Sequence, residues 1–253
     1  MSAVRFAGVA KAFGGHVALD DIDLDITSGS FVALIGTSGS GKTTLLRCIN
    51  RLIEPDAGAV FVDGADVAAG DPVTLRRGIG TVFQNVGLFP HLDVAANIAS
   101  VPRLRGWARE RIAARVAELL DLVDLPRGIA TRLPAALSGG QRQRVGFARA
   151  LAAGPRLMLL DEPFGALDPT TRDGLATRYR DLHDRLDLTS ILVTHDVQEA
   201  LLLADRIVVL RDGRIVADAT PAALLNGNSD PGVAAMIAVP RDQAARIAGL
   251  ARG

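Results

Sequence analysis

The sequence is short of cysteine, lysine and long apolar runs, and it carries no net charge. Its single cysteine, Cys48, cannot form an internal disulfide, and its apolar helical surroundings predict a core residue, which suits a reducing cytosol. No apolar run approaches the roughly 18 residues of a membrane-spanning helix, and no basic-then-apolar leader opens the chain. We therefore expect a protein that does not cross a membrane by itself.

The balanced charge, formally +0, argues against a mainly electrostatic nucleic-acid binder, and we expect no nucleic-acid partner. Apolar residues are plentiful, at 49% of the 253 residues. That is enough to bury a proper core in one large domain or two modest ones. The composition predicts a soluble globular protein.

Lysine is scarce, with two residues against 26 arginines, and one of the two lies in a glycine-rich loop. Residues 36–43 fit the pattern G-x-x-x-x-G-K-[ST] of the Walker A motif or P-loop, between an apolar β-prone run at 31–35 and a helical pattern from 44. The glycines let backbone N–H groups cradle phosphate oxygens, Lys42 reaches the β- and γ-phosphates, and the Thr43 hydroxyl binds Mg²⁺. The alternative, a glycine/serine-rich turn with an incidental lysine, leaves the choice of lysine unexplained. We predict that the nucleoside triphosphate is bound by Gly36, Thr37, Ser38, Gly39, Ser40, Gly41, Lys42, Thr43 and Thr44.

Two carboxylates end an apolar strand pattern at 157–162. Ligands of parallel α/β sheets bind at the carboxyl ends of strands, where Asp161 and Glu162 fall. This is the Walker B arrangement, in which Asp161 holds Mg²⁺ through water and Glu162 accepts a proton from, or orients, the attacking water. The alternative, two acids that cap the next helix, fits less well because Pro163 follows at once.

Two further polar residues end predicted strands. Gln84 ends the pattern at 76–84, and His195 follows the apolar run at 190–194. A histidine at a strand end is often structural, but here that end is again the ligand edge, so a hydrogen bond from His195 to a γ-phosphate is credible. His16, His91 and His183 lack such a setting and receive no role.

Residues 93–153 have a helical pattern with no convincing strand, including a helix-spaced apolar stripe at Ile112, Val116, Leu119, Leu120 and Val123. Later in this block Ser138 fits a helix N-cap, and two glycines follow it in the first turn. Glycines there make sense if a phosphate must approach the backbone N–H groups; a plain Ser-Gly-Gly turn is the alternative. The loop at 85–91 before the block carries Val86, Leu88 and Phe89, which we interpret as a partner-docking surface or as a loop packed on its own core.

The rest of the chain is patterned as short strands and helices. Residues 2–35 have short strands, with an apolar/acidic alternation at 22–26 that predicts a half-exposed antiparallel sheet. Phe13 lies at a Gly14-Gly15 turn, where it stacks on a flat base or, as the alternative, packs in the core. An amphipathic helix is expected at 170–186, a hairpin at 206–217, and a helix with Thr220 before Pro221.

In order and spacing these motifs resemble the ATPase subunits of ATP-binding-cassette (ABC) transporters, over roughly residues 3–226. The residues that carry the resemblance are Walker A at 36–43, Gln84, Leu-Ser-Gly-Gly-Gln at 137–141, Walker B at 157–162, Ala166-Leu167-Asp168 and His195. The resemblance implies an α/β P-loop NTPase core with a mixed sheet flanked by helices, an N-terminal antiparallel β subdomain and an inserted α-helical subdomain with the signature motif. We expect an ATP-binding domain over 1–226, with the helical subdomain at about 88–153, and a short helical tail over 227–253.

The resemblance also implies roles for these residues. Two copies would form a head-to-tail dimer that sandwiches two ATP molecules, each held by Walker A of one copy and by Ser138, Gly139, Gly140 and Gln141 of the other. Phe13 would stack on adenine, His195 would contact the γ-phosphate, and Asp168 would lie at the dimer interface. Gln84 would act with Glu162 in catalysis and join Thr43 and Asp161 at Mg²⁺. It would also couple nucleotide state to the loop Asn85–His91, which would dock on an integral-membrane permease.

A finer resemblance, in residues 36–58, 71–107 and 240–244, is to the ATPases of bacterial osmoprotectant importers for glycine betaine, choline or related quaternary amines. It implies a peripheral protein on the cytoplasmic face of the plasma membrane, with an extracytoplasmic solute-binding protein in the complex. Some of those ATPases carry a C-terminal regulatory domain, for which this chain is too short. Importers of amino acids, phosphonates or sulfonates are the alternatives, followed by a soluble ABC ATPase outside transport and by a P-loop kinase.

Overall fold

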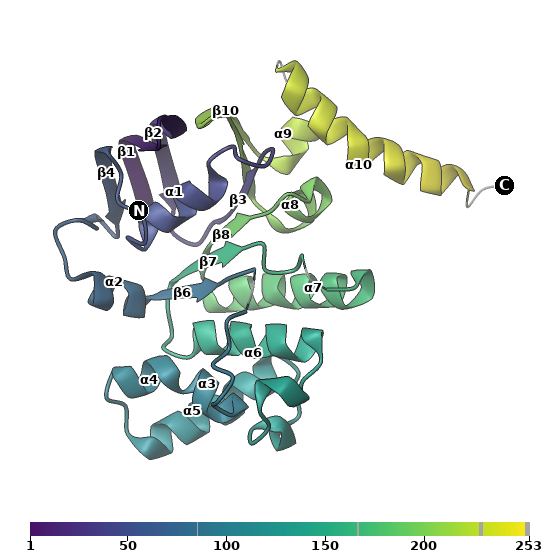
Figure 1. The fold of residues 1–253 in the computed structure, drawn as a ribbon. Helices are drawn as coiled ribbons and strands as arrows, with labels where there is room; N and C mark the ends of the chain where they lie inside the picture. Colours follow the sequence, from purple (N-terminus) through teal and green to yellow (C-terminus); the bar gives the residue numbers. More distant parts are fainter. Residues whose placement is uncertain (85, 166, 228–229, 251–253) are drawn as a thin grey trace. The chain divides into compact units, whose positions relative to one another are not determined.

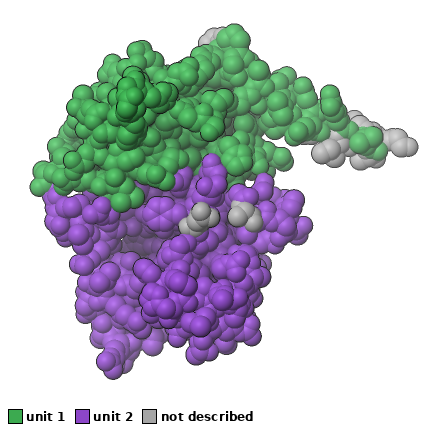
Figure 2. All heavy atoms as spheres, in the orientation of Figure 1, with its two compact units in different colours: residues 1–69, 191–253 green, residues 70–190 purple. Residues whose placement is uncertain are grey.

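The computed structural model describes residues 1–84, 86–165, 167–227 and 230–250. It divides into two compact units, which Figure 2 shows in two colours. Unit 1 comprises residues 1–69 and 191–253, and unit 2 comprises residues 70–190. The phosphate-loop motif therefore lies in unit 1, whereas the signature and Walker B motifs lie in unit 2.

Unit 1 begins with an antiparallel sheet in the order β2-β1-β4-β5 (Figure 1). Its strands are β1 (Ser2–Phe13), β2 (His16–Thr27), β4 (Ala57–Val62) and β5 (Ala65–Asp66). The predicted alternation at 22–26 is confirmed, since Ile22, Leu24 and Ile26 are buried while Asp23 and Asp25 are exposed. The prediction of short strands was wrong: β1 and β2 are 12 residues each, because shifts of register along the pair interrupt the apolar pattern without ending the strands.

The second sheet of unit 1 is mixed. Strand β3 (Phe31–Ile35), buried throughout, pairs in parallel with β9 (Arg206–Arg211), and β9 pairs antiparallel with β10 (Arg214–Ala219). Helix α1 (Lys42–Ile49) follows β3 and buries Cys48, as predicted. The unit also holds α8 (Val197–Leu203), α9 (Pro221–Leu225) and α10 (Pro231–Leu250), and Thr220 caps α9 as its sequence predicts. Strand β8 (Thr189–Val193) contains the boundary between the units.

Unit 2 contains two parallel strands, β6 (Ile79–Val82) and β7 (Leu157–Asp161), and the helices between and after them. Those helices are α3 (Val94–Ile98), α4 (Ser100–Leu104), α5 (Arg109–Leu122), α6 (Gly139–Leu151) and α7 (Pro169–Leu186), with short 3₁₀ turns at Arg127–Ile129 and Pro134–Ala136 (Figure 1). The described residues from 86 to 156 contain no strand, as the sequence predicts. Phe147 of α6 packs between Phe164 and Tyr179, with ring centroids 5.6 and 5.1 Å away.

The strand predicted at 76–84 is shorter than expected. Residues 76–78 end helix α2 (Pro72–Gly78), whose start is fixed by Pro72 at its first position and by the Asp71 side chain, which accepts a hydrogen bond of 2.8 Å from Thr74 N. Strand β6 then ends at Val82. Gln84 is therefore two residues past the strand, not its last residue.

Candidate functional site

The phosphate loop of unit 1 is built into its surroundings by backbone contacts that only glycine permits. Gly36 and Gly41 have φ values of 148° and 101°, and a Cβ at either position would overlap a carbonyl oxygen, Leu210 O for Gly36 and Ala18 O for Gly41. Gly41 is also the N-cap of α1. The strand–loop–helix arrangement that the sequence predicts is thus present.

The start of α1 suits an anion. No side chain among the described residues caps it, and no acidic residue lies in its first turn. The Nζ of Lys42 lies 2.9 Å from Gly36 O, 2.8 Å from Thr37 O and 3.3 Å from Ser40 Oγ, so the ammonium group is held inside the loop. A lysine ammonium group beside a helix start that no side chain caps is a phosphate-binding arrangement.

Two of the residues predicted for catalysis meet in unit 2. β7 is buried throughout, Asp161 included, and Glu162 leaves the strand with a left-handed φ of 47°. The Nε2 of Gln84, just past β6, donates a hydrogen bond of 2.8 Å to Glu162 Oε2. The carboxyl ends of two adjacent parallel strands thus bring an amide and a carboxylate together, at the edge where ligands of such sheets bind.

The donor types fit magnesium better than a transition metal. The described residues contain no group of three or more His, Cys, Asp or Glu side chains arranged for a metal. Hydroxyl, amide and carboxylate oxygens, from Thr43, Gln84 and Asp161, are hard ligands of the kind Mg²⁺ takes in small number, with phosphate and water completing its shell. Thr43 belongs to unit 1 and the other two to unit 2, so the combined set stays a prediction.

The signature residues form the start of α6. Ser138 Oγ accepts from Gln141 N at 3.2 Å, and Gln141 Oε1 accepts from Ser138 N at 3.0 Å, a reciprocal capping box. The N-cap prediction for Ser138 is confirmed. Nothing lies within 4 Å of the position that a Cβ would take at Gly139, so the backbone there is open to approach.

The other predicted residues lie on the surface. Phe13, the last residue of β1, is 47% exposed, so the alternative of a core aromatic is wrong. His195 is exposed just after β8. Asp168 caps α7 by accepting from Thr171 N at 3.1 Å, and hydrogen bonds from Thr171 lower the pKa of its carboxyl group. Ala166 lies outside the described residues, as does Asn85 of the predicted docking loop.

The rest of the docking loop is partly exposed and firmly held. Val86 and Leu88 are half-buried, and Phe89 is 45% exposed. The buried amide of Asn97, in α3, accepts from Phe89 N at 2.8 Å and donates to the carbonyl oxygens of Phe89, Leu92 and Asp93. Sequence reasoning missed Asn97, although a polar residue between apolar Val94 and Ile98 is a signal for such a role.

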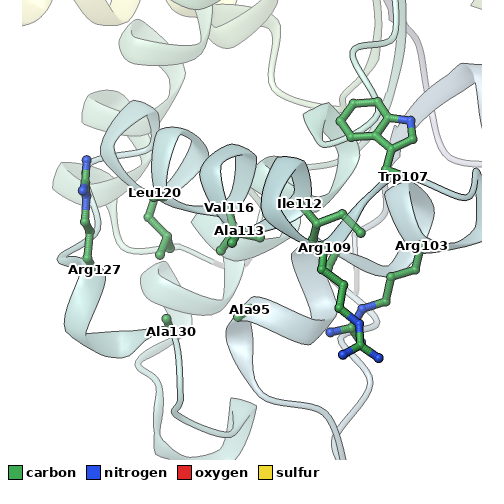
Figure 3. A pocket seen from close by; sticks show the side chains of 12 residues that line it. Ala95, Arg103, Trp107, Arg109, Ile112, Ala113, Val116, Leu120, Arg127 and Ala130 are labelled. Atoms are coloured by element: carbon green, nitrogen blue, oxygen red, sulfur yellow. The ribbon is translucent and has the colours of Figure 1, made fainter.

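Next to this loop, unit 2 has a surface cavity of about 820 Å³, which we call the helical groove (Figure 3). Its walls come from α3, α5 and the segments that flank them. Five of the twelve lining residues are alanine, and the larger apolar ones are Trp107 and three side chains from the predicted stripe of α5. Arginines lie at both ends: Arg103 and Arg109 close together at one, and Arg127 at the other. The lining residues are Ala95, Ala99, Arg103, Trp107, Arg109, Ile112, Ala113, Val116, Ala117, Leu120, Arg127 and Ala130.

Within the part of the chain that the structure describes, no helix is both long and apolar enough to cross a bilayer. The sequence could not reveal the helical groove, because small residues on several helices become a cavity only after the helices pack.

Comparison with known proteins gives consistent matches. The family model described as "ABC transporter" matches residues 19–165. The glycine betaine/carnitine/choline transport ATP-binding protein OpuCA of Bacillus subtilis is 51% identical over 223 residues, which are 88% of this chain and 59% of that protein. The glycine betaine uptake system ATP-binding protein YehX of Escherichia coli is 48% identical over 222 residues, 88% of this chain and 72% of that protein. The chain spans only 56–59% of the length of the OpuCA and OpuBA relatives.

Among solved structures, the chain is similar to the ATP-binding cassette MJ0796, a dimeric structure in a post-hydrolysis state bound to ADP and Pi. The TM-score is 0.78 at 34% identity, and the match covers 86% of this chain and 98% of that one.

Replacing Lys42 by alanine should abolish ATP binding, because the loop loses the only charge that it places inside the phosphate cradle. Isothermal titration calorimetry with Mg-ATP measures this. The matched control is Arg214→Ala, which removes a cation from an exposed pair with Asp20 elsewhere in unit 1 and should leave the ATP affinity unchanged. An unaltered dissociation constant for Lys42→Ala would remove Lys42 from the site.

Proposed function

The chain belongs to the ABC transporter family, and we propose that it is the ATP-hydrolysing subunit of an importer for a small solute, a quaternary-amine osmoprotectant such as glycine betaine or choline. The observation that carries the enzymatic part is the hydrogen bond between Gln84 and Glu162 at the ends of two parallel strands. It puts a candidate base and a water-orienting amide together at the edge of the sheet where ligands bind.

ATP binding is assigned to the residues of unit 1. Backbone N–H groups of the loop at 36–44 and the Lys42 ammonium hold the phosphates, while the exposed ring of Phe13 offers a face for adenine. His195, which is exposed just after β8, would hydrogen-bond the γ-phosphate. Mg²⁺, held by Thr43, Gln84 and Asp161, supplies neutralisation of the phosphate charge when bound.

Hydrolysis is assigned to Glu162, which accepts the proton of the attacking water as that water approaches the γ-phosphorus. The amide of Gln84 holds the carboxylate through Oε2 and so fixes its orientation at the end of the strand. In this assignment the left-handed backbone of Glu162 has a purpose, because it turns the carboxylate away from the strand direction that Asp161 follows.

A second copy of the chain completes each site. Ser138, Gly139, Gly140 and Gln141 of one copy would approach the γ-phosphate held by the other, with Asp168 at the interface between the copies. The capping box supports this, because a serine hydroxyl that accepts from Gln141 N still has its own proton to donate. The dimeric, ADP- and Pi-bound cassette among the similar structures supports a dimer of two such chains.

The permease is expected to bind at the docking loop and the helical groove. An alanine-lined groove accepts a helix closely, Phe89 offers an exposed apolar contact, and the arginines at the ends of the groove favour an acidic residue on the incoming segment. The protein would then be peripheral, on the cytoplasmic face of the membrane, with a solute-binding protein on the other side. ATP binding favours the closed dimer and hydrolysis releases it, which drives alternating access in the permease.

The nature of the solute rests on the printed functions of the relatives, which name glycine betaine, carnitine and choline. Amino-acid, phosphonate and sulfonate import are the alternatives, and an ABC ATPase outside transport is weaker because it has no use for the docking surface. An ATPase need not touch its cargo, so the assay must include the partners.

Replacing Glu162 by glutamine should keep ATP binding, stop turnover and trap a dimer, because proton acceptance is lost while the phosphate cradle remains. Size-exclusion chromatography with light scattering, with and without ATP, measures this. The same protein in ADP serves as the control and should stay monomeric. A monomer under saturating ATP would contradict the two-copy site.

Filling the helical groove should prevent permease binding. Ala113→Arg places a long cation inside the groove, whereas Ala114→Arg, the next residue of the same helix, places it outside the lining. We expect the first variant to lose co-purification with the permease from detergent and the second to keep it, with equal melting temperatures. Equal binding by both variants would exclude the helical groove as the docking site.

The identity of the solute is tested by measuring the ATPase rate of the complex, reconstituted in lipid with its permease and binding protein. Glycine betaine, choline, carnitine and proline are added one at a time. Stimulation by a quaternary amine is the expected result. If none stimulates while the basal ATPase is intact, the osmoprotectant assignment is wrong and the importer assignment stands.

A further inference from the structure

Helix α6 carries the signature residues at its start and holds the docking loop near its end. Three turns after Ser138, Arg149 Nη1 donates to Gly87 O at 2.7 Å and Nη2 donates to Val86 O at 2.5 Å. The guanidinium carbon also lies 6.0 Å from the centroid of the Phe89 ring. One planar side chain thus binds two successive carbonyl groups of the loop and lies against its exposed aromatic residue.

Gly146, one turn before Arg149 on the same face of α6, fixes the loop from a second direction. A Cβ at Gly146 would overlap Cγ1 of Val86, so the loop packs directly on the helix backbone. Burial also lowers the pKa of the Arg149 guanidinium from its usual value. We call Gly146 and Arg149 with the segment 86–89 the clamp.

The rest of α6 is tied to its neighbours as firmly. The buried Gln143 donates to Pro163 O, directly after Glu162, and Arg115 from α5 donates to Leu151 O and Ala152 O at 3.0 and 3.3 Å at the helix C-terminus. The capping box closes the other end. Both ends of α6 therefore have their backbone groups hydrogen-bonded, and Gln143 ties the helix to the residue that follows Walker B. Such a helix transmits displacement as a rigid element.

We propose that the clamp makes the docking loop move with α6, so that closure of the signature end onto ATP is transmitted to the permease-binding surface, with Arg149 as the positioning residue. The proposal rests on the proposed function, in which ATP brings the signature of one copy to the other. Arg149 touches neither nucleotide nor permease in this assignment. Its variants should therefore disturb coupling and leave ATP hydrolysis by the isolated chain unchanged.

The position of the loop can be measured without the permease. Cys48 is fully buried and burial raises the pKa of its thiol to about 11, so a cysteine introduced at exposed His91 is labelled selectively. Spin labels at position 91 of both copies in the Glu162→Gln dimer report the loop-to-loop distance by pulsed electron resonance. With ATP we expect a narrow distribution of the label-to-label distance in the Glu162→Gln dimer, which is the parent protein here. We expect that narrow distribution to be lost when Arg149→Ala is added to the parent.

Arg144→Ala is the matched control, because Arg144 is on the same helix but bonds Asp124 O and not the loop. It should keep the narrow distance. Arg149→Lys keeps the positive charge but lacks the planar group that donates to two carbonyl groups at once. This variant should therefore restore the narrow distance only in part. If Arg149→Ala fails to fold, Gly146→Ala, which pushes Val86 off the helix, takes its place.

In the reconstituted complex, Arg149→Ala should lower permease-stimulated ATPase by about tenfold, the size of a typical coupling, while the KM for ATP of the isolated chain stays unchanged. A narrow distance and full stimulation in Arg149→Ala, with a responsive parent, would overturn the clamp alone. A parent that shows no ATP-dependent distance would instead overturn the two-copy site, and the clamp with it.

Discussion

Unit 2 depends on hydrogen bonds that arginine side chains donate to backbone carbonyl groups. Loop and helix-end carbonyls cannot bond within their own segments, and each needs a donor from elsewhere. Arg149 serves Val86 and Gly87, Arg115 serves Leu151 and Ala152, and Arg105 serves Ala153. The fork of a guanidinium satisfies two carbonyls at once, which an ammonium group does less well. These hydrogen bonds give a structural use to some of the 26 arginines of a chain that has only two lysines.

The two helix starts assigned to phosphate solve different problems. Helix α1 begins at Gly41 with no side-chain cap among the described residues, so a phosphate held by the same copy can act as the cap. Helix α6 begins with a complete capping box and is stable without a ligand. In the proposed two-copy site, the phosphate comes from the other copy, so the start of α6 must be ordered before the phosphate binds. The capping box provides that order. The open backbone at Gly139 then lets the phosphate approach.

Much of the site was predictable because it is local. Three of its parts follow from the identity and spacing of a few adjacent residues. They are the phosphate loop, the Ser138 cap and the two acids at the end of β7. The errors were of another kind. The strand at 76–84 was drawn too long because the Asp71–Pro72 helix start was overlooked, and the bulged strands β1 and β2 were divided. Asn97 was missed although its place between Val94 and Ile98 is a signal for a buried polar role. The role of Arg149 could not be predicted, since Arg149 bonds residues 62 and 63 positions away that only folding brings near.

The docking loop is held by two helices at once. Arg149 and Gly146 of α6 fix residues 86 and 87, whereas Asn97 of α3 fixes residues 89–93. Helix α3 also lines the helical groove through Ala95. The loop is thus a bridge between the helix that carries the signature and the helix that walls the proposed permease surface.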